Sequence, residues 1–121
     1  MKRLLLFLAV LSVAILFHSC SKEDEFDENL LYGRWEPVSG TSMHFRYDSN
    51  GEGVTWNLKE DQEESEGQKF TWTLVKSELT QIHLMEIGGG IIPKIYTVTE
   101  LTATTLKYKD SFSSYSFSKM N

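Results

Sequence analysis

The sequence predicts an all-β domain, a small up-and-down barrel of eight antiparallel strands. From residue 43 to the end, apolar and polar residues alternate in short runs, as in strands that bury one face. Short turns separate these runs, and no part of the region shows a convincing helical pattern. Eight short strands at regular spacing are typical of a sandwich or a barrel.

The turns are the second observation behind this fold class. The strands are expected at residues 30–38, 43–47, 54–58, 69–74, 81–87, 94–99, 106–109 and 114–118. Asn50-Gly51 is a typical hairpin turn, and Glu100 to Thr105 is expected to form another. Because Pro93 cannot donate to a ladder, it should start a strand or lie on an edge. Every connection suits a hairpin, and closure removes exposed edges. An open, strongly bent sheet or a two-sheet sandwich is the alternative.

Bulky aromatic residues on the expected strands should face the interior. They are Phe45, Tyr47, Trp56, Phe70 and Trp72, and they could line a ligand cavity or form the core. The interior of an eight-stranded barrel is only just wide enough to be filled by side chains or to hold one small ligand. A chain this short therefore favours a filled core over an open cavity.

The first residues have the pattern of a secretory signal peptide. Lys2 and Arg3 are positive, and residues 4–17 are apolar except for one serine. This run is shorter than the roughly 20 residues that a membrane-spanning helix needs. It therefore indicates a helical signal peptide over residues 1–19 that is removed by cleavage.

The chain has a single cysteine, Cys20, directly after this leader. An exported chain with one cysteine has no internal disulfide. Phe17-His18-Ser19-Cys20 resembles a bacterial lipobox, in which cleavage precedes a cysteine that then carries diacylglycerol. The resemblance implies a lipoprotein bound to a membrane through acyl chains on Cys20, which anchor it almost permanently.

An acidic segment follows the cysteine. Ser21-Lys22-Glu23-Asp24-Glu25 resembles the export signal that sends lipoproteins of Bacteroidetes to the outer face of the outer membrane. The alternative is a plain solvated tether on the periplasmic face, since like-charge runs are usually disordered. We expect a disordered tether over residues 20–29 and a folded domain over residues 30–121.

The start of this domain resembles the lipocalins. Gly33-Arg34-Trp35 is similar to their Gly-x-Trp signature, and the turn at 48–53 and the stretch 101–106 look like small lipocalin-like lipoproteins of Bacteroidetes. The resemblance implies that Gly33 and Trp35 belong to a plug that closes one end of the barrel. Lys119 is the nearest equivalent of the basic residue that stacks on this tryptophan in the family.

Other chemistry finds little support. His44 and His83 lack a framed nucleophile and a third ligand at metal spacing, so no catalytic or metal site and no cofactor is expected. The acidic loop 60–66 lacks the ligand spacing of a calcium loop. The net charge of −5 without a clustered basic face argues against nucleic acid.

These observations predict a non-enzymatic, surface-anchored binding or accessory module of the cell envelope. Its partner could be a small apolar ligand, a glycan or an envelope protein. The alternative is a dry-cored structural or interaction subunit of an outer-membrane complex.

Overall fold

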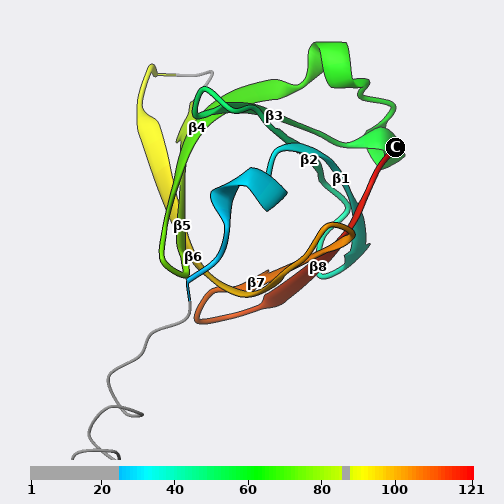
Figure 1. The fold of residues 1–121 in the computed structure, drawn as a ribbon. Coiled ribbons are helices and arrows are strands. Elements are labelled where there is room, and N and C mark those ends of the chain that lie inside the picture. The colour runs from blue at the N-terminus through cyan, green and yellow to red at the C-terminus, as the bar shows by residue number, and fades with distance from the viewer. Residues whose placement is uncertain (1–24, 86–87) are drawn as a thin grey trace, which may run out of the picture.

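Eight antiparallel strands close into a barrel in the computed structural model, which describes residues 25–85 and 88–121 (Figure 1). The strands pair in sequence order, so the predicted up-and-down barrel is confirmed. They are β1 (Gly33–Ser39), β2 (His44–Tyr47), β3 (Glu52–Trp56), β4 (Gln68–Val75), β5 (Glu78–Leu84), β6 (Ile91–Leu101), β7 (Thr105–Lys109) and β8 (Ser114–Lys119). The signal peptide, Cys20 and Ser21 to Asp24 lie outside the described residues.

Alternation along the strands places one set of side chains inside the barrel. The buried hydrophobic cluster holds Trp35, Phe45, Tyr47, Phe70, Trp72, Leu79, Val98, Leu101, Leu106, Tyr108 and Phe117 together with Leu31. Their spacing of two residues matches the pleat of a strand. The predicted alternation therefore identifies the inward face of β2, β4, β7 and β8 correctly.

Trp56 is the exception, and its predicted place in the interior is wrong. Phe45 pairs with Thr55 across β2 and β3, so Thr55 points inward and Trp56 outward. Trp56 is nevertheless only 3% exposed, and its ring stacks on His44 with centroids 5.3 Å apart. The outer face of β3 is buried as well as the inner one. The sequence of β3 therefore does not show which of its residues face the interior.

The acidic loop covers that outer face. It contains two short 3-10 turns, η2 (Leu58–Glu60) and η3 (Glu64–Glu66), and η3 contacts β3. Glu64 Oε1 lies 2.9 Å from Arg34 Nε and 3.2 Å from Arg46 Nη1. These ion pairs hold the loop against β1 and β2, while Glu60, Asp61 and Glu63 stay exposed.

The second half of the barrel differs from expectation in several boundaries, since β5 begins at Glu78 and ends at Leu84, and β6 begins at Ile91. β6 continues to Leu101, so Glu100 lies in a strand and the turn is only residues 102–104. Glu100 pairs with Lys107 after an irregularity at residue 99, which places the two opposite charges side by side. Pro93 lies near the start of β6, where β6 pairs with β5 while its pairing with β7 begins only at Thr97.

A short 3-10 turn, η1 (Glu28–Leu30), closes one end of the barrel (Figure 1). Asp27 caps it, since its carboxylate accepts a hydrogen bond from Asn29 N at 2.9 Å. Leu31, which follows, is fully buried, and Phe26 packs against the core. The folded domain therefore includes residues before Leu30.

Trp35 is the centre of this closed end. It is fully buried, and its Nε1–H donates to Leu31 O at 2.9 Å. Lys119, its cross-strand partner on β8, places its ammonium 4.6 Å from the ring centroid and donates to Tyr32 O. A Cβ on Gly33 would lie 2.8 Å from Lys119 Cε and Nζ, at a φ of +121°. The glycine is therefore needed for the lysine to reach the tryptophan.

We expect Trp35→Ala to destabilise the domain by about 3–5 kcal/mol, because it opens a cavity under η1. That is a large share of a total stability of about 5–10 kcal/mol. Thermal unfolding of the chain from Glu25 onward measures the loss. Trp35→Phe is the matched variant and should lose much less, since it keeps most of the ring volume. An unchanged melting temperature for Trp35→Ala would show that the residue is not a plug.

Candidate functional site

The predicted aromatic residues of the interior, Trp56 excepted, meet in one cluster. Neighbouring ring centroids lie 4.5–5.9 Å apart along a path from Trp72 on β4 to Tyr96 on β6. The path runs through Tyr47, Phe70, Phe45, Phe117 and Tyr108. Several of these contacts are edge-to-face, a favourable geometry for aromatic pairs. Rings from β2, β4, β6, β7 and β8 thus span the interior from wall to wall.

A buried polar chain runs beside these rings. Gln81 is fully buried, and its Nε2 donates to the Tyr47 hydroxyl at 2.8 Å. His83 Nε2 lies 2.8 Å from Gln81 Oε1, which can only accept, so the proton is on Nε2. The sequence prediction missed this chain, although residues 81 and 83 share the phase of buried Leu79.

Burial keeps this chain neutral. Desolvation, followed by the positive charge of Lys94, lowers the pKa of His83 to about 4. Desolvation likewise raises the pKa of Tyr47 and Tyr108 far above the usual range. At neutral pH the interior therefore offers uncharged hydrogen-bonding groups that are already engaged. Such a chain satisfies buried polar atoms and supplies no activated nucleophile.

The two histidines of the domain lie on opposite faces of the barrel wall. His44 points outward, where it stacks on Trp56, and burial lowers its pKa against the opposing influence of Glu36. Its Nδ1 has no hydrogen-bond partner among the described residues. His83 points inward and stacks on Phe70, so the two imidazoles cannot serve one reaction centre. Within the described ranges, no cluster of three or more potential metal-ligating side chains is present.

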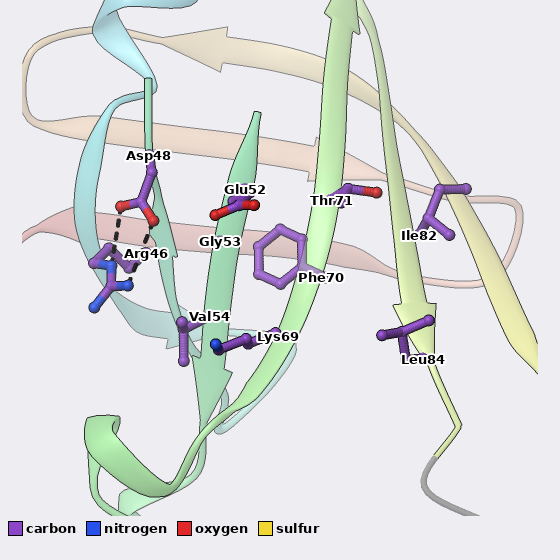
Figure 2. Close-up of a pocket in the computed structure, with 10 residues that line it drawn as sticks. All are labelled: Arg46, Asp48, Glu52, Gly53, Val54, Lys69, Phe70, Thr71, Ile82 and Leu84. Carbon is purple, nitrogen blue, oxygen red and sulfur yellow. Dashed lines mark hydrogen bonds and ion pairs between the residues drawn. The ribbon is translucent and has the colours of Figure 1, made fainter. Parts of the chain in front are cut away.

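A groove of about 340 Å³ lies on the outer face of the wall (Figure 2). Its lining comes from β2 to β5 and from the turn after β2: Arg46, Asp48, Glu52, Gly53, Val54, Lys69, Phe70, Thr71, Ile82 and Leu84. Figure 2 shows Arg46 and Asp48 at one side of it and Ile82 and Leu84 at the opposite side. The groove is thus amphipathic, with a charged end and an apolar end.

Gly53 and Phe70 form the wall beneath the groove. The Phe70 ring lies over Gly53, its cross-strand partner, on the inner face, where a Cβ would come within 2.5 Å of the ring. An aromatic ring that packs over a strand glycine stabilises a sheet. On the outer face, Val54 and Thr71 border the groove beside this pair.

The charged end of the groove is already neutralised. Arg46 Nε lies 3.0 Å from Asp48 Oδ1, and the same guanidinium contacts Glu64. The hydrogen bond to Asp48, outweighing partial burial, raises the pKa of Arg46. The groove therefore suits a ligand group that is mainly apolar, such as an alkyl chain or an apolar side chain.

None of the helical segments in the described part of the chain has the length and apolarity required to cross a bilayer.

We expect Thr71→Gln to reduce the fluorescence enhancement of the apolar dye ANS severalfold, because the longer polar side chain fills the groove. Thr73→Gln is the matched control: Thr73 is exposed on the same face of β4 but does not line the groove. Titration of both purified variants with the dye compares them. Equal, strong enhancement by both would show that the dye binds outside the groove and would contradict the groove as the apolar site.

No family model matches the chain, and no curated protein matches it significantly. Among solved structures, the barrel is similar to a lipocalin-like protein from Bacteroides uniformis ATCC 8492. The TM-score is 0.60 at 15% sequence identity, over 75% of this chain and 99% of that one. At this identity the likeness shows the fold: the chain forms a lipocalin-like barrel.

Proposed function

We propose that the chain is a lipid-anchored protein of the outer membrane whose barrel is a non-enzymatic binding or accessory module. The observation that carries the binding mode is the path of aromatic rings across the interior. Because side chains occupy the space where a lipocalin would hold an internal ligand, binding falls to the outer surface. The groove over β3 to β5 offers a site there.

The partner of this groove has an apolar group for its hydrophobic end. An envelope protein that inserts a side chain, or a small apolar ligand, fits the lining of Ile82 and Leu84. A glycan fits less well, because Arg46 and Asp48 at the charged end are held in an ion pair with each other and Arg46 also contacts Glu64. A structural role in an outer-membrane complex remains the second candidate, and the filled core favours it over a carrier of internal ligands.

The non-enzymatic role is supported by the placement of the titratable groups. His44 and His83 are separated by the barrel wall, and each stacks on an aromatic ring. Hydrolytic or acid–base chemistry needs a base, a nucleophile and an orienting group within hydrogen-bond reach. The polar chain from Tyr47 to His83 is instead internally satisfied.

The anchor is supported by the sequence pattern of residues 1–20 and by the short distance along the chain to the barrel. Phe26 already packs against the core, six residues after Cys20. The domain would therefore be held close to the membrane surface. Outer-face display is supported by the acidic segment Ser21 to Glu25.

We expect Cys20→Ala to abolish incorporation of a metabolically supplied radioactive fatty acid, since no thiol remains to carry the lipid. The labelled protein is detected after immunoprecipitation and gel electrophoresis. Ser65→Ala, a change in the exposed acidic loop, serves as the control and should keep the label. Label retained on the alanine variant at position 20 would refute the anchor.

Replacing Lys22 to Glu25 by alanine should keep the lipid but leave the protein on the periplasmic face. Protease treatment of whole cells, followed by immunoblotting, reports which face is exposed. Alanine at Glu60 and Asp61, two exposed acidic residues in the barrel loop, controls for a general loss of charge. If both variants are digested as fully as the wild type, the acidic segment is only a tether.

A further inference from the structure

The β5–β6 hairpin exposes an unusual number of large apolar side chains. Leu84, Met85, Ile91, Ile92 and Ile95 are 41–61% exposed, and we call these five residues the hairpin patch. They make up more than half of the large hydrophobic residues that the described chain exposes. Scattered single residues of this kind are common on soluble domains, but a group gathered on the two faces of one hairpin marks a contact surface.

The fold of the barrel does not require this patch. Ile91 to Tyr96 pair with β5, and the pairing of β6 with β7 starts at Thr97. The first half of β6 therefore lies outside the closed wall, and the hairpin projects beyond it (Figure 1). Both of its faces meet solvent, so Ile92 on the inward side is exposed like Ile91 on the outward side. Folding leaves about half of each of these side chains exposed, and contact with an apolar surface would bury the rest.

The charge around the patch has the opposite sign to the chain as a whole. Strands β4 to β7 carry four exposed lysines, Lys69, Lys94, Lys107 and Lys109, against the two acidic residues Glu78 and Glu100. The chain itself has a net charge of −5. An apolar surface that has Lys94 next to Ile95 and Lys69 on the same groove as Leu84 suits the headgroup region of a bilayer, where anionic groups lie above the acyl chains.

The short segment between Cys20 and the barrel keeps the barrel close to the anchor. Five peptide units separate Cys20 from Glu25, and they span at most about 18 Å when extended. In Figure 1 the described chain begins near the β4–β5 turn, and the tip of the β5–β6 hairpin lies at the other end of β5. A lipid on Cys20 therefore keeps the barrel in the neighbourhood of the bilayer.

We propose that the hairpin patch rests on the same bilayer that holds the anchor, so that the barrel lies on its side against the membrane. The proposal depends on the anchor at Cys20 proposed above. The patch side chains enter the boundary between headgroups and acyl chains, and the surrounding lysines stay at the level of the phosphates. Because the anchor already holds the protein at the membrane, the patch meets the bilayer at a high effective concentration. A weak affinity of the patch for lipid is then enough to keep it in contact.

A second copy of the chain is a poorer occupant of the patch. Dimerisation through the open edge of β6 would extend the sheet, but Pro93 lacks the N–H that such pairing needs. Lys94, next to it, would bring like charges together across a two-fold axis. Neither feature opposes contact with lipid.

The test uses the full lipidated protein reconstituted in vesicles of phosphatidylethanolamine and phosphatidylglycerol. Ile95→Cys and Val38→Cys each receive a fluorescent label, because acylation occupies the only native thiol. Val38 is the matched control: it is exposed to a similar degree, and its strand β1 lies three strands from β6, which carries Ile95, in the closed barrel. Some of the lipids carry a nitroxide quencher near the headgroup end of the acyl chain.

We expect the label at position 95 to be quenched about twofold more than the label at position 38, since the patch lies at the depth of the nitroxide. Equal quenching at both positions overturns the proposal. Strong dipolar coupling between spin labels at position 95 on two molecules would also overturn it, in favour of a second copy. The mass of the N-terminal peptide tests the anchor separately. If Cys20 carries no acyl chain, the proposed lipid anchor is refuted, and the membrane contact of the hairpin patch is refuted with it.

Discussion

The contact of Trp35 with Lys119 holds the barrel together, because it joins the first strand to the last at the end where the chain enters. The ammonium lies over the indole ring and also binds a backbone carbonyl, so the lysine connects β8, β1 and the segment before β1. Gly33 leaves the space that this lysine occupies. The Gly-x-Trp pattern thus has a direct physical cause here: the glycine admits the cation, and the tryptophan receives it.

Closure at that end determines what the interior can hold. With Trp35 and Leu31 filling the bottom, the rings of β2, β4, β7 and β8 fill the space above. A polar group in such an interior must find a partner, and Gln81 does so by linking Tyr47 to His83. The outer face carries a groove beside Gly53, and the proposed binding would take place there.

The alternation of apolar and polar residues predicted the barrel because nearly every strand has one buried face and one exposed face. The alternation failed to place Trp56, because the loop held by Glu64 covers the outer face of β3. Residues on both faces of β3 are therefore buried. Of the site residues, Phe45, Tyr47, Phe70 and Trp72 could be read from alternation. The groove could not, since it depends on which residue lies opposite Gly53, and register across β3 and β4 is not visible along one strand.

Leu84 connects the two outer surfaces, because it borders the groove and belongs to the hairpin patch. When the patch lies on lipid, the apolar end of the groove opens beside the membrane, while the Arg46–Asp48 end faces water. The polarity of the groove then changes in the same direction as that of the membrane surface, from the apolar acyl chains to water. A ligand or partner with an apolar tail and a polar head would be oriented by the bilayer before it reaches the protein. The anchor would in that case position the binding site as well as retain the protein at the membrane.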